Sequence, residues 1–256
     1  MSGLSRDGFL GGRLHLWQPA KGYRAGIDPV LLAAAVPARA GERVLELGCG
    51  VGAALLCLGT RVPGLGLTGI EVQADLAVLA RRNAEAAELP ARIAAADLTR
   101  LPAEMRGESY HHVMMNPPYF DRGAGTAAPD PSREGAMGEA TPLDAWVAAA
   151  ARRLRPGGRL TAIHDAARLP DLLAACAGRL GSVTVLPLAP RAGRSARRIL
   201  LSARKDGRAP FTLLPPLVLH QGDRHQGDGD DYAPEVRAVL RDAAPLPWGP
   251  QKSAAF

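Results

Sequence analysis

The four residues Asn116-Pro117-Pro118-Tyr119 have the types and the order needed to hold a planar exocyclic amine. Such an amine is a poor nucleophile, because its lone pair is delocalised into the ring. Two hydrogen-bond acceptors placed at its two hydrogens draw the nitrogen towards tetrahedral geometry. The side-chain oxygen of Asn116 and the carbonyl of Pro117 are suited to this task. Tyr119 is suited to stack on the ring, so the turn predicts group transfer to an amine nitrogen.

The two prolines keep this turn rigid. Proline has no N–H and restricts the residue before it to extended backbone, which keeps the segment out of a helix. The nitrogen loses its proton after it has gained the new group, so no base is needed before attack. Catalysis then depends mainly on positioning for in-line displacement. In an arbitrary chain the same residues would only close a strand, so their surroundings decide the interpretation.

A glycine-rich turn, Glu46-Leu47-Gly48-Cys49-Gly50-Val51-Gly52, joins a predicted strand to a predicted helix. Glycine permits a positive φ and lets the backbone approach a ligand, and the following helix N-terminus offers unpaired N–H groups. Gly48, Gly50 and Ala53 also satisfy the dinucleotide pattern G-x-G-x-x-G/A, with Glu71 where a ribose-binding carboxylate belongs. The glycines alone therefore leave NAD and S-adenosylmethionine open.

Three carboxylates at predicted strand ends favour a ligand without phosphates. Glu46 lies just before the glycines, where it would repel a pyrophosphate but attract a sulfonium or an ammonium group. Glu71 is suited to accept hydrogen bonds from ribose hydroxyls, and Asp97 from an adenine amine. Each acid taken alone could also be a helix cap or a solvent-exposed loop residue without a ligand. All three together indicate S-adenosylmethionine.

Short apolar runs alternate with helical stretches from Arg43 onwards, which predicts an α/β fold. Parallel strands need crossover helices, so we expect a Rossmann-like, mostly parallel sheet of seven strands with helices on both faces and a C-terminal antiparallel hairpin. The predicted strands span residues 43–47, 67–71, 92–96, 111–115, 159–164, 183–188 and 198–203. The predicted helices span residues 51–60, 73–87, 143–154, 166–180 and 234–241, with Pro156-Gly157-Gly158 ending the third and Pro170 interrupting the fourth.

The composition bounds the class of protein. The chain has 256 residues, a net charge of +6 and a pI of about 9.7, which is compatible with a polyanionic partner and equally with a basic surface that has none. Its three cysteines lack the spacing of a zinc site, and reduced thiols fit a cytoplasmic protein. We expect no metal and no membrane span, and the sequence does not reveal the oligomeric state.

With these motifs, the chain resembles the class I S-adenosylmethionine-dependent methyltransferases with an N-P-P-Y motif, over roughly residues 9–240. More narrowly, it is similar to the bacterial valine-tRNA (adenine-N6)-methyltransferase group. Three stretches carry that similarity: residues 16–19 with 22–32, residues 116–119 with the long loop after them, and residues 215–220 before a short acidic stretch and Tyr232. The resemblance implies methyl transfer to adenine N6 in tRNA.

The resemblance also implies residue roles. Glu46, Gly48 and Gly50 would surround the methionine part of the cofactor, with Glu71 at the ribose and Asp97 at the adenine. The Gly26–Pro29 turn would close over the cofactor's carboxylate end and open a helix over residues 30–35, which Asp28 would cap. Asn116, Pro117 and Tyr119 would hold the target base, Asn116 beside the cofactor as well. The residues expected to meet the RNA backbone are Arg24, Arg122 and Arg133.

The expected organisation is one unit with two parts. Residues 1–36 would contribute to the cofactor and substrate pocket, and residues 37–256 would form the methyltransferase domain, with a tail from about residue 243. Residues 121–140 form a long loop without periodicity. The final hairpin is surrounded by a cluster of basic residues: Arg191, Arg194, Arg197, Arg198, Arg204 and Lys205. These side chains would either bind phosphate groups or form a charged face exposed to solvent.

Alternative substrates remain open at this point. Guanine in ribosomal RNA, adenine in DNA and a glutamine amide in a protein all present a planar nitrogen to the same turn. More distant alternatives are an NAD-dependent oxidoreductase and an RNA-binding protein without catalysis. Trp17 and Trp146 are interpreted as packing residues.

Overall fold

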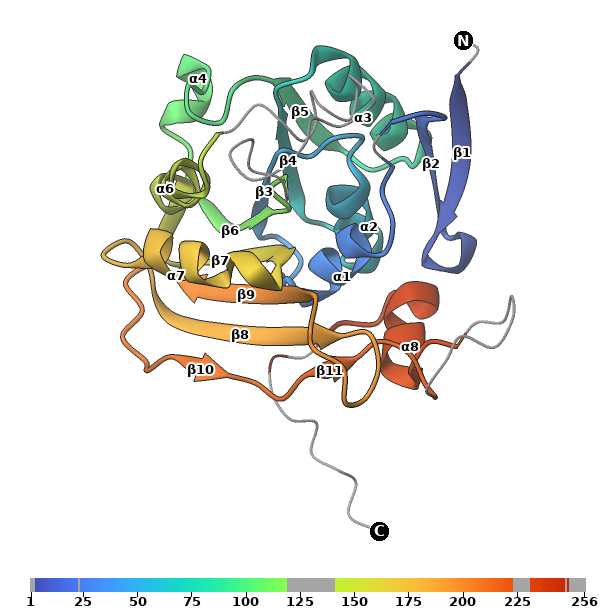
Figure 1. Ribbon diagram of the computed structural model, residues 1–256. Coiled ribbons are helices and arrows are strands. Elements are labelled where there is room, and N and C mark those ends of the chain that lie inside the picture. The colour runs from blue at the N-terminus through green and yellow to red at the C-terminus, as the bar shows by residue number, and fades with distance from the viewer. Residues whose placement is uncertain (1–2, 23, 119–140, 223–230, 247, 249–256) are drawn as a thin grey trace.

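The computed structural model describes residues 3–22, 24–118, 141–222, 231–246 and 248. Its centre is one large sheet (Figure 1). The strands are β3 (Arg43–Leu47), β4 (Gly66–Glu71), β5 (Ala91–Ala95), β6 (Tyr110–Met115), β7 (Leu154–Asp165), β8 (Gly181–Ala189), β9 (Arg198–Arg204), β10 (Thr212–Leu213) and β11 (Leu217–Val218). They lie in the order β10-β8-β9-β7-β6-β3-β4-β5, and β11 also pairs with β8.

The sheet confirms the predicted architecture. The neighbours from β5 to β7 are parallel, whereas β9 runs antiparallel between β7 and β8. Each of the seven predicted strands has its counterpart. β10 and β11 extend the edge beside β8, and neither was predicted, since a two-residue strand leaves no periodicity to detect.

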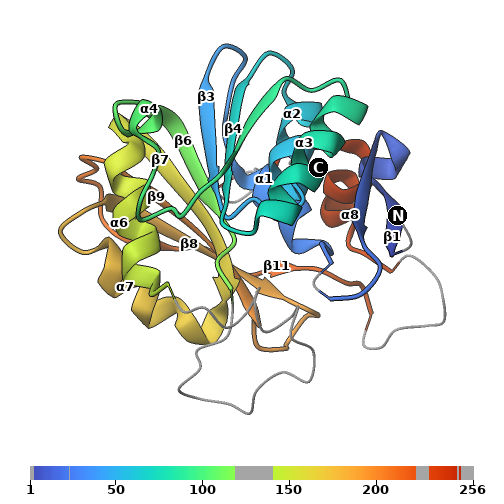
Figure 2. The same cartoon turned by 90° about the horizontal axis from the view of Figure 1, so that it is seen from above.

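Helices cover both faces (Figure 2). One face carries α1 (Asp28–Ala35), α2 (Ala53–Arg61), α3 (Ala74–Ala86) and α8 (Pro234–Asp242), and the other carries α4 (Ala103–Arg106), α6 (Leu143–Arg153) and α7 (Leu169–Cys176). Two buried clusters follow from the alternation of side chains along each strand. Val44 and Met114 join the first cluster, whereas Leu45, Val113 and Met115 join the second.

Two local predictions were wrong. Pro170 does not interrupt a helix: it lies in the first turn of α7, where its missing N–H costs nothing, after a short 3₁₀ turn over Ala166–Arg168. Pro156-Gly157-Gly158 does not end α6 either. That helix ends at Arg153, because Leu154 turns extended and buries its side chain at the start of β7.

An N-terminal hairpin, which the sequence analysis did not predict, packs beside α3 (Figure 1). It consists of β1 (Leu4–Phe9), a 3₁₀ turn over Leu10–Gly12 and β2 (Leu14–Pro19). Leu14, Leu16 and Gln18 alternate towards the interior, which is the pattern of a half-buried strand.

Asn83 attaches this hairpin to the rest of the protein. Its side chain is fully buried, accepts a hydrogen bond from the Trp17 N–H at 2.8 Å and donates to the carbonyls of Trp17 and Val51 at 3.0 Å each. One amide on α3 therefore links β2 to the glycine-rich turn after β3. Arg82, its neighbour, stacks on Trp17 at 4.6 Å from the ring centroid.

We expect Asn83→Ala to lower the free energy of unfolding by about 3 kcal/mol, because three buried backbone groups lose their partner. Urea denaturation followed by circular dichroism measures the change. Glu85→Ala, an exposed change on the same helix, is the control and is expected to alter stability little. Equal effects of the two changes would contradict the role given to Asn83.

Candidate functional site

A cavity of about 540 Å³ lies at the carboxyl ends of β3, β4, β5 and β6. Open parallel sheets bind their ligands at this edge. Seven of the predicted site residues line the cavity: Glu46, Gly48, Gly50, Glu71, Asp97, Asn116 and Pro117. Residues spread over seventy positions of sequence are thus brought together because their strands are neighbours in the sheet.

The glycine-rich turn has the backbone that its sequence predicts. Gly48, Gly50 and Gly52 have φ values of 66°, 54° and 87°, all in the left-handed region. Gly48 is also sterically confined, since a Cβ there would lie 2.5 Å from Cη2 of Trp146. At Gly50 the same atom would meet nothing within 4 Å. The turn therefore needs glycine for conformation at both positions, and for space only at Gly48.

Two buried carboxylates hold this turn from inside. Glu46, which is 3% exposed, accepts a hydrogen bond from the Leu55 N–H at 2.9 Å, in the first turn of α2. Glu71, which is 5% exposed, accepts from the N–H groups of Gly50 at 2.8 Å and Gln73 at 2.9 Å. Each acid uses part of its acceptor capacity on backbone and directs the rest towards the cavity.

Burial changes the acidity of both groups. It raises the pKa of Glu46 well above its ordinary value; the hydrogen bond from Leu55 offsets the rise in part, and the nearby charge of Glu71 adds to it. Burial also raises the pKa of Glu71, against the effect of its backbone hydrogen bonds. A cationic ligand in the cavity would favour the charged form of both carboxylates.

Asp97 closes the same side of the cavity, just after β5. Its Oδ1 accepts from the N–H and the hydroxyl of Thr99, at 2.7 and 2.8 Å. These bonds fix the carboxylate at the cavity wall. Within the described ranges, Oδ2 of Asp97 makes no hydrogen bond to protein, and Asp97 lines the cavity, so this oxygen is available to accept from a ligand.

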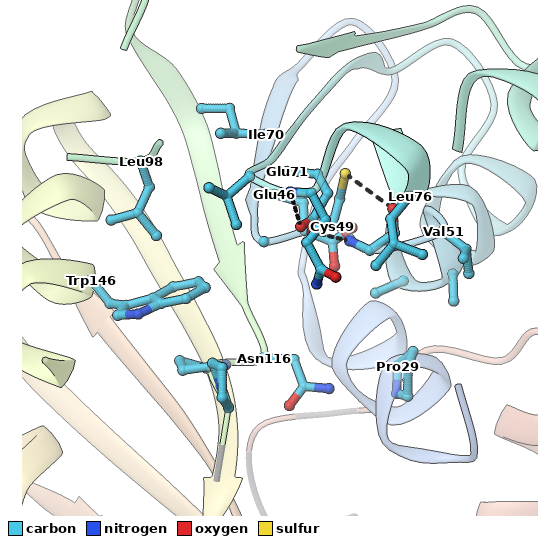
Figure 3. Close-up of a pocket in the computed structure, with 18 of the residues that line it drawn as sticks. Pro29, Glu46, Cys49, Val51, Ile70, Glu71, Leu76, Leu98, Asn116 and Trp146 are labelled. Carbon is cyan, nitrogen blue, oxygen red and sulfur yellow. Dashed lines mark hydrogen bonds between the residues drawn. The ribbon is translucent and has the colours of Figure 1, made fainter. Parts of the chain in front are cut away.

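The opposite wall consists of Asn116, Pro117, Pro118 and Trp146. The Asn116 side chain projects into the space between the Trp146 indole and Pro29 (Figure 3). Trp146 is 7% exposed and lies in the first turn of α6. It packs against Gly48, so it is a core residue as interpreted and a cavity wall as well.

S-adenosylmethionine fits this cavity by charge. Three carboxylates (Glu46, Glu71 and Asp97) line it, and none of its described lining residues is cationic. A sulfonium and an ammonium group gain from that environment, whereas a pyrophosphate would be repelled. The left-handed glycines leave backbone exposed to a ligand where side chains would fill the space.

Several predicted residues lie elsewhere. The predicted cap role of Asp28 is wrong: Ile27 occupies the cap position of α1, and Asp28 is the first helical residue, where its carboxylate pairs with Arg198 at 3.2 Å. It does not line the cavity, although its neighbour Pro29 does. Arg24 pairs with Asp7 at 2.8 Å and is 45% exposed. The predictions for Tyr119, Arg122 and Arg133 fall outside the described residues, and all these roles stay predictions.

Among the wall residues not identified from the sequence are Ala25, Thr141 and Trp146. Pro29, by contrast, belongs to the Gly26–Pro29 turn that the resemblance placed at the cofactor. Small and apolar residues carry no chemical signal, so Ala25 was not recognisable as an individual wall residue. Trp146 had a usable signal. It is one of three tryptophans in the chain and lies near the start of the helix predicted over residues 143–154, so its place beside the site could have been predicted.

Metal-binding groups of side chains and membrane-spanning helices are both absent from the described part of the chain. No group of three metal-ligating side chains is found there. No helix in those ranges combines the length and apolar character needed to cross a bilayer.

Comparison with known proteins gives a consistent class of enzyme. Residues 25–184 match the family of the methyltransferase small domain. A protein of Dickeya chrysanthemi named tRNA1(Val) (adenine(37)-N6)-methyltransferase is 30% identical over 230 residues, which cover 86% of this chain and 87% of that protein. A protein of the same name from Porphyromonas gingivalis is 32% identical over 250 residues, covering 91% and 92%.

Solved structures support the fold. An Agrobacterium tumefaciens protein described as a predicted O-methyltransferase has a TM-score of 0.68 and 26% identity, covering 86% of this chain and 98% of its own. The T. thermophilus 16S rRNA N2 G1207 methyltransferase has a TM-score of 0.54 and 22% identity, covering 79% and 50%, and shows the fold alone. The names agree on methyl transfer and differ in the acceptor.

Comparing Gly48→Ala with Gly50→Ala tests the steric argument. Both changes place a side chain at positive φ, which costs about 1 to 2 kcal/mol. Gly48→Ala must also displace the Trp146 ring, and we expect it to cost about 2 kcal/mol more than Gly50→Ala. Urea unfolding without ligand measures the difference. Equal costs would show that Trp146 does not confine this position.

Glu46→Gln tests the effect of the buried carboxyl on stability. A pKa raised above 4.5 by folding means that the native form is favoured while the group is protonated and loses stability as pH rises towards the folded-state value. We therefore expect the melting temperature of Glu46→Gln to gain on that of the native protein as pH rises from about 4.5 to 8. An identical scan of Glu104→Gln, an exposed change, is the control. A difference independent of pH would contradict the raised pKa.

Proposed function

Since the chain belongs to the methyltransferase small domain family, and is an S-adenosylmethionine-dependent N-methyltransferase, we propose that its acceptor is N6 of an adenine in tRNA. The observation that carries the proposal is the position of Asn116 and Pro117. They line the same cavity as the three carboxylates suited to the cofactor, so an amine held by the turn would face the methyl donor.

The cofactor supplies an electrophilic methyl group on a sulfonium cation. We assign its ribose hydroxyls to Glu71, its adenine amine to Asp97, and its methionine end to the glycine turn beside Glu46. The left-handed backbone of Gly48 and Gly50 leaves space for that close approach. The NAD-dependent alternative is set aside, because the family is one of methyltransferases and a pyrophosphate would meet Glu46.

The protein's own chemistry concerns the acceptor nitrogen. The Asn116 side-chain oxygen and the Pro117 carbonyl would each accept a hydrogen bond from the amine, so that the lone pair points at the methyl carbon. A bond forms from nitrogen to carbon while the carbon–sulfur bond breaks and its electron pair stays on sulfur. The nitrogen then releases one proton to water. Proline at 117 and 118 holds the two acceptors in fixed positions.

Two features support tRNA as the substrate. The chain carries a net charge of +6, which favours association with a polyanion. The relatives that cover most of its length are named for adenine 37 of a valine tRNA. Such a substrate fits the cytoplasmic location predicted above.

We further propose that residues 1–36 work as part of the pocket, through Ala25 and Pro29, rather than as a separate unit.

The test is incubation with labelled S-adenosylmethionine and an unmodified transcript of a valine tRNA, followed by nucleoside analysis. The expected product is N6-methyladenosine, lost when the adenine at position 37 is replaced by guanine. Methylated guanine, a 2′-O-methyl nucleoside, or label incorporated only into DNA or protein would each contradict the proposed acceptor. No incorporation into any of these substrates would contradict the activity itself.

Asn116→Ala tests the role of the turn. We expect turnover to fall at least about a hundredfold, as when a preorganised hydrogen-bonding group is removed from an active site. Affinity for S-adenosylhomocysteine, measured by calorimetry, should change little. Asn116→Asp keeps acceptor oxygens at the position and should retain more activity than the alanine variant. Unchanged turnover in Asn116→Ala would sink the mechanism.

A further inference from the structure

The loop between β8 and β9, residues 190–197, lies at the edge of the sheet where the cavity opens. β7 and β8 both run antiparallel to β9, so β8 ends at the same edge as β6 and β7. Ala189, the last residue of β8, therefore lies on the side of Met115, which precedes Asn116. Figure 2 shows this loop at the edge where β6 also ends.

Ion pairs fix both ends of this loop. Arg191 donates to Asp231 at 2.6 Å and to the carbonyl of Gly222 at 3.1 Å. Arg198 donates to Asp165 at 3.0 Å and to Asp28 at 3.2 Å. Both arginines are partly buried, with 15% and 30% of their side chains exposed. These two guanidinium groups therefore hold the loop in place.

Arg194 and Arg197, which lie between Arg191 and Arg198 in the sequence, have no such ion pairs within the described residues. Both are exposed, and neither side chain has a hydrogen bond within those ranges. Only their backbones are engaged: the Arg194 N–H donates to the Arg191 carbonyl, and the Arg197 carbonyl accepts from Ala166. Two charged groups thus extend into solvent from a loop whose ends are fixed.

The rest of the basic cluster is not available in this way. Arg204 donates to the carbonyl of Gly157 at 3.0 Å, and Lys205 to the carbonyls of Ala151 and Leu154. Both also lie at the opposite edge, because β9 ends there. Of the six basic residues, only Arg194 and Arg197 are therefore both exposed and located at the edge of the sheet where the cavity lies.

An ion pair connects the β8–β9 loop to a segment that lines the cavity. Asp28, the partner of Arg198, is followed directly by Pro29, which lines the cavity opposite Asn116. The ion pair thus joins the β8–β9 loop to the N-terminal part of the pocket.

We propose that Arg194 and Arg197 form a docking surface for the phosphodiester backbone of the RNA substrate, which rests on the proposed function. A guanidinium group can donate hydrogen bonds to two oxygens of the same phosphate, and it stays charged at any physiological pH. RNA is favoured over a membrane, because the other residues between Arg191 and Arg197 are Ala192, Gly193, Ser195 and Ala196, so the loop has no large apolar side chain to insert there. The anchored ends reduce the ordering cost of binding.

The test compares three double variants with the native protein: Arg194→Ala with Arg197→Ala on the proposed surface, and two matched controls. Arg155→Ala with Arg208→Ala removes two exposed arginines from the opposite edge of the sheet. Arg100→Ala with Arg152→Ala removes two exposed arginines from a separate cavity of about 420 Å³ between α4 and α6. Each variant has the same net charge.

The probe is an unmodified transcript of a valine tRNA. Its dissociation constant is measured between about 50 and 300 mM salt, where each lost phosphate contact lowers the slope of log K against log salt by about 1. The 194/197 variant should lose about 2 from this slope, raise KM for the RNA and keep kcat. The two controls should keep the native slope, and all variants should keep affinity for S-adenosylhomocysteine.

Distinct outcomes overturn the proposal. A native slope in the 194/197 variant, an equal loss in all three pairs, or a loss confined to the 100/152 pair would each do so. Failure of the native protein to methylate the transcript would overturn the proposed function instead, and would be seen before any variant is compared. Loss of methylation with an unchanged salt slope would show that the two arginines do not bind phosphate.

Discussion

Burial of two carboxylates behind a glycine turn is the constraint on which the site depends. Glu46 and Glu71 satisfy the N–H groups of Leu55, Gly50 and Gln73, and so fix the turn and the start of α2 against the sheet. Burial raises the pKa of both acids, so holding the two carboxylates charged costs free energy when no cation lies beside them. A cationic ligand removes that cost. The same feature therefore lowers the stability of the free protein and favours the ligand it is shaped to hold.

The cavity is assembled from parts far apart in the chain. Ala25 and Pro29 come from the N-terminal segment, Asn116 from the end of β6, and Trp146 from the start of α6. Trp146 contacts Gly48 directly, so the wall on the side of the acceptor and the turn on the side of the cofactor are in van der Waals contact. A displacement of α6 would reach both. Separate elements thus form one rigid frame around the reacting groups, which is what in-line transfer requires.

The sequence predicted what has a periodic or a chemical signal. The strands of the central sheet, and the positions of Glu46, Glu71, Asp97 and Asn116 at their ends, follow from apolar runs and residue types. Pro170 was misread because proline ends one helix and begins another, and only the backbone distinguishes the two. The wall residue Ala25 and the two-residue strands β10 and β11 carry no such signal. Arg198 forms ion pairs and Arg194 does not, within the described residues, because of which residues the fold brings beside each of them. A local sequence pattern does not contain that information.

The attachment of the N-terminal hairpin through Asn83 has a consequence for how the protein is made. β2 leaves the ribosome before α3, and the amide that binds Trp17 follows 66 residues later. Arg13, in the same hairpin, donates to the carbonyl of Arg241, which is made later still. The hairpin therefore reaches its final contacts only after these elements have been made, and until then its apolar face, Leu14 and Leu16, lacks the surface that covers it. Transiently exposed apolar surface of this kind favours association between newly made chains.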